Sequence, residues 1–224
     1  MKIPVRTLLA FVVVFATYAF AFRPEIGGTA LFFWVFGLPH LALAALAVHK
    51  LWDDGVLRDR LVPRGGDIAI GVIVAFLLLL SSWAARATLT PPGTSRSAWL
   101  FSIYLQLGDP ELIQRSFVLT LVLLVIALSE ELVWRGMVLE ELNERLGTRV
   151  GWIAAALLYC LASLPTAYTL RDSVAGLNPL IVFATLGCGL VWTFMAGRLG
   201  RLVPGAVSHM VFTYFSAVQF HLPF

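Results

Sequence analysis

Long apolar runs alternate along this chain with short segments that carry almost all of its charge. Hydrophobic residues make up 59% of the 224 positions and charged residues 13%, whereas soluble domains contain about half and a quarter. Such a chain has too little polar surface to coat a globule in water. A membrane-spanning helix needs about 20 mostly apolar residues, and several runs reach that length. The sequence therefore predicts an all-α fold, a polytopic bundle of about seven transmembrane helices.

The predicted spans cover most of the chain, and Pro, Gly and charged residues fall between them. We expect the spans near residues 4–22, 28–49, 67–85, 115–134, 150–170, 177–197 and 202–220. The first run also resembles a signal peptide, because Lys2 and Arg6 precede an apolar stretch that ends in a small-x-small pattern at Ala21. Its length is greater than such a signal needs, which favours a span that is retained.

Basic residues are distributed unequally between the loops on the two sides of these spans. With the N-terminus inside, the inside loops carry most of the 16 Lys and Arg residues. Because basic residues favour the cytoplasmic side, this pattern predicts an N-terminus inside and a C-terminus outside. The segment 86–115 contains a short apolar patch and is predicted to be an outer loop with an interfacial or re-entrant piece. The segment 137–146 is predicted to be an amphipathic helix on the cytoplasmic surface, ending at Gly147.

Two adjacent carboxylates, Glu130 and Glu131, lie at the predicted inner end of the fourth span, and Arg135 follows one turn later. Ionisable groups in hydrocarbon cost about 2.5 kcal/mol or more each, so they require an explanation. Glu131 and Arg135 share a helix face at i, i+4 spacing, which predicts an ion pair. Glu130 lacks that partner, and it could serve as a general base for water. Alternatively, both glutamates only end a helix at the headgroup layer.

The residues from Glu130 to Gly136 have the form Glu-Glu-x-x-x-Arg-Gly. At the end of a membrane helix, this resembles the first motif of the CAAX protease and bacteriocin-processing family of glutamate-dependent intramembrane endopeptidases. That family includes the type II CAAX prenyl endopeptidases and the bacterial myxosortases. The resemblance covers roughly residues 115–217. It implies a catalytic membrane core at 115–224, accessory helices and an external loop at 1–114, a bacterial cytoplasmic membrane, and a membrane-anchored protein or peptide substrate.

The family's second motif is Phe-x-x-x-His and its third is His-x-x-x-Asn or Asp. The fifth span offers Tyr159 to Ser163 at the second motif, and the last span offers His209 to Thr213 at the third. Ser163 therefore replaces a histidine, and Thr213 replaces Asn or Asp.

Carried over to this chain, the resemblance makes Glu130 the water-activating base and His209 an oxyanion donor. Glu131 and Arg135 become a structural pair beside them. The possible auxiliary residues are Tyr159, Ser163 and Thr213.

Other functions fit parts of the sequence. The loss of a histidine at Ser163 fits a non-catalytic relative that binds a membrane peptide or acts as an immunity protein. A serine protease built on Ser163 and His209 lacks the usual glycine context, and a transporter should carry polar residues in both halves of the bundle. No His-Glu-x-x-His motif or basic stripe occurs, so no metal, cofactor or nucleic acid is expected. His40 and His49 lie outside the resembling region and are predicted to be packing and interfacial residues.

Overall fold

The computed structural model describes residues 3–218, and its regular elements are helices, as predicted. Five helices in this part of the chain are long and apolar enough to cross a membrane, so the protein is a membrane protein. They are α2 (Ala30–Asp53), α4 (Asp67–Leu89), the continuous helix Phe117–Leu146, the pair α9 and α10 within Thr148–Thr169, and α11 (Leu180–Leu199). The apolar helices α1 (Val5–Ala21) and α12 (Val203–Val218) are shorter, so a total of seven spans remains a prediction.

The fourth predicted span differs most from its prediction. α7 (Phe117–Glu131) continues through a π-helical segment, η1 (Leu132–Val138), into α8 (Leu139–Leu146), which makes one helix of 30 residues. The predicted end at 134 and the separate surface helix at 137–146 are therefore wrong. The acidic residues that suggested a break are satisfied by other helices, since Glu141 accepts hydrogen bonds from Thr7. The predicted C-cap at Gly147 is confirmed, because its φ of 76° ends the helix.

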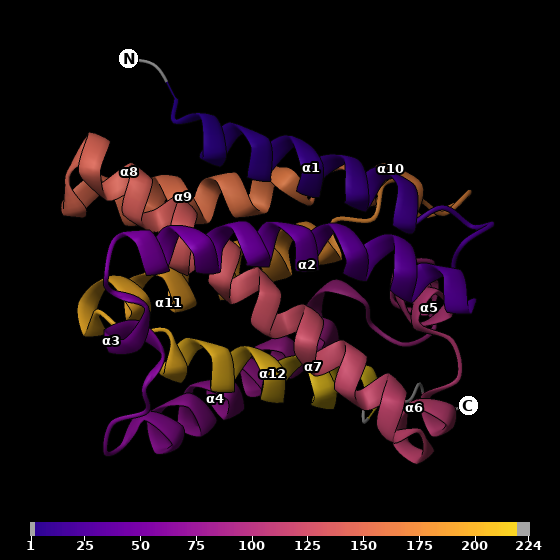
Figure 1. The fold of residues 1–224 in the computed structure, drawn as a ribbon. Coiled ribbons are helices and arrows are strands. Elements are labelled where there is room, and N and C mark those ends of the chain that lie inside the picture. Colours follow the sequence, from indigo (N-terminus) through magenta and orange to yellow (C-terminus); the bar gives the residue numbers. More distant parts are fainter. Residues whose placement is uncertain (1–2, 219–224) are drawn as a thin grey trace.

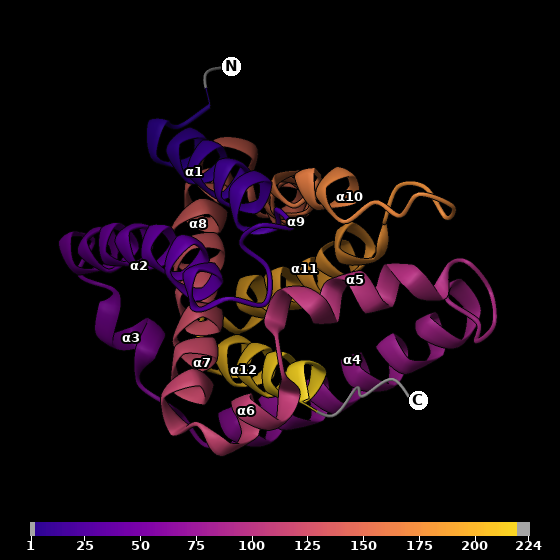
Figure 2. The same cartoon turned by 90° about the vertical axis from the view of Figure 1, so that its right-hand side faces the viewer.

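This long helix crosses the centre of the bundle, with α2 on one side and α12 and α4 on the other (Figures 1 and 2). Small residues permit close packing between these helices. A Cβ at Gly71 of α4 would lie only 2.7 Å from the side chain of Val207 on α12, so the two backbones approach closely there. α11 packs on α9 (Thr148–Ala162), which is followed by the short helix α10 (Pro165–Thr169).

The predicted outer loop contains two short helices, α5 (Ser97–Leu107) and α6 (Pro110–Arg115). Asp109 caps α6 by accepting a hydrogen bond from the Glu111 amide, and Pro110 occupies the first turn. α5 lies across one end of the bundle, where Asn178 donates a hydrogen bond to the carbonyl of Trp99. At the opposite end, Arg60 of α3 (Leu57–Leu61) forms an ion pair with Glu140 of α8, and Arg201 forms one with Asp67, the first residue of α4.

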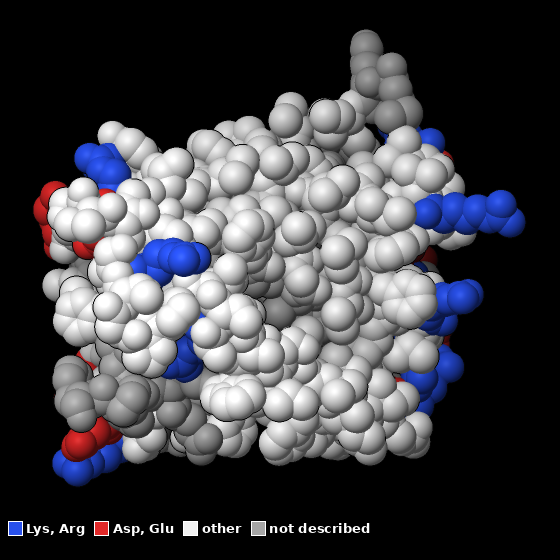
Figure 3. All heavy atoms as spheres, turned by 180° about the vertical axis from the view of Figure 1, so that it is seen from behind, with Lys and Arg blue, Asp and Glu red and all other residues white. Residues whose placement is uncertain are grey.

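Charged side chains lie toward the two ends of the molecule, and a broad uncharged belt separates them (Figure 3). Many large apolar side chains in the membrane-length helices are exposed, among them Phe76, Leu80 and Phe183. Exposed apolar side chains in a continuous belt are typical of a surface that contacts lipid. The surface is hollowed within this belt, on the face that carries α4 and α11 (Figure 3).

Candidate active site

Glu130 on α7 is the point where side chains from four other helices converge. Tyr18 of α1 donates a hydrogen bond to its Oε1 at 3.4 Å, and Tyr159 of α9 donates to its Oε2 at 3.1 Å. His40 Nε2, from α2, lies 3.3 Å from Oε1. His209 Nε2, from α12, lies 3.3 Å from Oε2. Each carboxylate oxygen therefore has one phenol and one imidazole beside it.

The position of Glu130 along its helix places this cluster deep in the bundle. At 1.5 Å per residue, Glu130 lies about 20 Å from the start of the continuous helix at Phe117 and about 24 Å from its end at Leu146. The expectation that both glutamates lie at the end of a helix is therefore wrong, and so is the alternative that they are hydrated at the headgroups. Glu130 is 4% exposed and Glu131 is 1% exposed, so the protein has replaced their hydration with internal partners.

Glu131 and Arg135 form the ion pair that their spacing predicts, with 3.1 Å between Nη1 and Oε1. Arg135 is fully buried, and its guanidinium lies 4.6 Å from the centre of the Tyr159 ring and 5.4 Å from that of Trp192. Cation–π contacts of this kind offset part of the cost of burying the charge. Arg135 lies within η1, and π-helical insertions often occur at functional sites. Gly205 permits α12 to approach the pair, since a Cβ there would lie 2.8 Å from Glu131 Oε2.

His209 connects the two glutamates. Its Nδ1 lies 3.0 Å from Glu131 Oε1, while its Nε2 faces Glu130. The ring stacks on Trp192 with 4.0 Å between centroids, and Trp192 in turn donates a hydrogen bond to Ser208. A carboxylate oxygen can only accept, so a His209 nitrogen that carries a hydrogen donates it to the glutamate that it faces. His209 is thereby held in an orientation from which Nε2 can donate a hydrogen bond.

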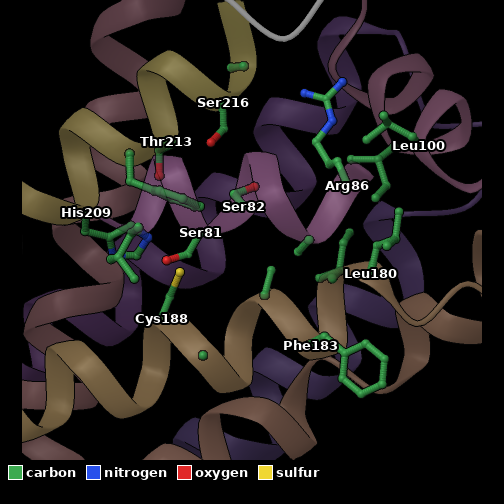
Figure 4. A pocket seen from close by; sticks show the side chains of 18 of the residues that line it. Ser81, Ser82, Arg86, Leu100, Leu180, Phe183, Cys188, His209, Thr213 and Ser216 are labelled. Atoms are coloured by element: carbon green, nitrogen blue, oxygen red, sulfur yellow. The ribbon is translucent and has the colours of Figure 1, made fainter. Parts of the chain in front are cut away.

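A cavity of about 510 Å³ adjoins Glu130 and His209 (Figure 4). α4, α5, α11 and α12 supply most of its wall, which is largely apolar. In Figure 4, Thr213 and Ser216 follow His209 along α12, and Cys188 comes from α11. Small-molecule and peptide sites commonly have roughly 300–1,000 Å³ and a few convergent polar groups, so this cavity can hold a short peptide segment beside Glu130.

The three auxiliary residues are placed differently from one another. Tyr159 contacts Glu130 directly, and Thr213 lines the cavity one helical turn beyond His209. Ser163 does neither. It is fully buried, and its hydroxyl donates to the Cys160 carbonyl at 2.8 Å and lies 2.7 Å from the Thr185 hydroxyl. The structure therefore brings together Glu130, Glu131, Arg135, Tyr159, His209 and, at the cavity wall, Thr213, and leaves out Ser163.

Two residues at this site were not predicted, Tyr18 and His40. The prediction that His40 only packs between helices misses its contact with Glu130. A signal was present, because Phe36 to His40 has Phe-x-x-x-His spacing, but it lies before the glutamates in the chain instead of after them. Tyr18 follows Thr17 in an apolar run, and no sequence pattern marks it. His49 is exposed and pairs with Asp53, in keeping with its predicted place at a helix end.

Within residues 3–218, no group of three or more His, Cys, Asp or Glu side chains could hold a metal ion.

The Rce1-like family model, described as type II CAAX prenyl endopeptidase Rce1-like, matches residues 113–215. This stretch carries both glutamates, Arg135 and His209, but neither Tyr18 nor His40. No curated protein and no solved structure matches the chain.

Proposed function

Since residues 113–215 form an Rce1-like domain of the type II CAAX prenyl endopeptidase family, we propose that this membrane protein is an intramembrane endopeptidase. Its reaction would be hydrolysis of a peptide bond in or near the membrane segment of a protein substrate. The observation that carries the proposal is the convergence of two phenols and two imidazoles on Glu130 at the wall of a cavity. A buried carboxylate with fixed donors around it and space beside it is suited to general base catalysis.

In the proposed reaction, Glu130 takes a proton from a water molecule in the cavity as the water oxygen attacks the carbonyl carbon of the substrate. His209 Nε2 donates a hydrogen bond to the oxyanion that forms, and the Thr213 hydroxyl can add a second. The tetrahedral intermediate then breaks its C–N bond, and protonated Glu130 returns its proton to the leaving nitrogen. The Glu131–Arg135 pair acts indirectly by holding Nδ1 of His209.

The position of the cavity supports a membrane-anchored substrate. Its walls include α4 and α11, and the molecular surface is hollowed within the uncharged belt on the face that these helices form (Figure 3). A substrate helix could therefore approach from the bilayer without carrying its apolar residues through water. The orientation with the N-terminus inside would place α5, which covers one end of the cavity, on the outer side.

The direct test uses purified protein in lipid vesicles with a panel of synthetic single-span peptides in ¹⁸O-labelled water. We expect mass spectrometry to find two fragments that together contain the peptide and one water, with ¹⁸O in the new carboxyl group. If the protein binds these peptides but never cleaves one, the peptide-binding or immunity function becomes the better explanation.

Ser163→Ala is expected to lower the cleavage rate by less than about tenfold, well below the roughly 10²–10⁴-fold that a general acid or base contributes. The reason is that the Ser163 hydroxyl bonds to Cys160 and Thr185 and does not reach Glu130. Steady-state rates of the variant and the wild type give the comparison. A Ser163→Ala protein without activity, together with a covalent adduct trapped on wild-type Ser163, would instead indicate a serine nucleophile.

A further inference from the structure

We infer that His40 is the histidine that keeps Glu130 ionised and oriented as the base, although it lies on α2 and outside the segment that resembles the family. This inference rests on the proposed function, and it extends the active site into the N-terminal helices. His40 does not line the cavity, so it contacts Glu130 from the side away from the substrate. It is therefore a positioning residue that acts through Glu130.

The hydrogen bonding of His40 determines what its second nitrogen can do. Nδ1 lies 2.7 Å from the carbonyl oxygen of Phe36, one turn earlier on the same helix. A carbonyl oxygen can only accept, so Nδ1 must carry a hydrogen. Nε2 is then left facing Glu130 Oε1 at 3.3 Å. Two bare acceptors at this distance would repel each other, so a proton must lie between them.

That proton can belong to either partner. If His40 holds it, an imidazolium lies beside the Glu130 carboxylate. If Glu130 holds it, a neutral imidazole lies beside a protonated glutamate. Only the first state leaves Glu130 able to accept a proton from water. His40 is fully buried, so bulk water does not compete for its contact with Glu130. The proton therefore lies on one of these two side chains.

The surroundings of the pair favour the ionised state. Tyr18 and Tyr159 donate hydrogen bonds to the two oxygens of Glu130, and hydrogen bonds to a carboxylate stabilise its charged form. The Phe36 ring lies 4.6 Å from the His40 ring between centroids, where it can stabilise a cation. The other ionisable groups nearby are His209, which faces Oε2, and the Glu131–Arg135 ion pair.

The test compares His40→Ala and His40→Gln with the wild type on the same cleaved peptide. Both variants are expected to lower kcat by roughly 10²–10⁴-fold with little change in KM, because His40 does not touch substrate. Gln can donate a hydrogen bond from about the position of His40 Nε2 but cannot carry a positive charge. If the role of His40 were purely structural, the His40→Gln variant would therefore retain activity. The matched control is His49→Ala, an exposed histidine on the same helix, which should keep the wild-type rate.

A second readout is the pH–rate profile. Once His40 is replaced, only the imidazole of His209 remains beside the Glu130 carboxylate, so the low-pH limb of the profile should move to higher pH in both variants. The inference would be overturned if His40→Gln kept the wild-type kcat and pH–rate profile while the separate variant Glu130→Gln was inactive. That result would leave the proposed function standing. Absence of cleavage by the wild type would defeat the proposed function itself, and the role of His40 with it.

Discussion

Glu130→Gln is expected to lower the rate of proteolysis by up to about 10⁴-fold, while the protein remains folded in the membrane. The amide has nearly the same size as the carboxylate, and its single oxygen can still accept one of the two hydrogen bonds that Tyr18 and Tyr159 donate to separate oxygens of Glu130. It cannot take a proton from water, so the attacking nucleophile is not formed. The cleavage rate of the purified variant in vesicles, measured by mass spectrometry, gives the result.

Glu141→Gln is the matched control for this substitution. Glu141 is another buried glutamate of the same continuous helix, but its carboxylate bonds to the backbone and hydroxyl of Thr7 and lies outside the cavity. We expect it to retain the wild-type rate within a few-fold. A Glu130→Gln protein that cleaves at the wild-type rate would rule out Glu130 as the base.

Glu131→Ala and Arg135→Ala are each expected to lower the free energy of unfolding by about 3–5 kcal/mol and to reduce activity as well. Each substitution leaves one charge buried without its ion-pair partner, at a position where water does not reach. Activity should fall because Glu131 also holds Nδ1 of His209. Unfolding in detergent, followed for both single variants and the double variant, measures the coupling between the two residues.

The exposed pair Glu111 and Arg115 provides the comparison. It has the same order and the same i, i+4 spacing, with 3.2 Å between charged atoms, but its side chains are 65% and 82% exposed. Solvent screening should reduce its coupling to less than about 0.5 kcal/mol. If the Glu131–Arg135 pair couples as weakly as this, water must reach it and the site is more open than the structure indicates.

Local features of the sequence predicted several parts of this molecule. The apolar runs predicted membrane-length helices, and the i, i+4 spacing predicted the ion pair between Glu131 and Arg135. The division of the chain at residue 114 into accessory helices and a catalytic core stays a prediction. Tyr18 and His40 contact Glu130 across that boundary, so the contacts around this glutamate extend into the predicted accessory region.

The depth of the site and the identity of the partners of Glu130 required the tertiary structure. Charges in the sequence predicted that the fourth span ends near residue 134, whereas the helix continues to Leu146 because Glu131, Arg135 and Glu141 find partners inside the protein. Whether a run of residues is apolar, or two residues share a helix face, depends only on near neighbours in the chain, and the sequence determines it. Which histidine meets Glu130 depends on how distant helices pack, and only the tertiary structure decided that it is His40 together with His209.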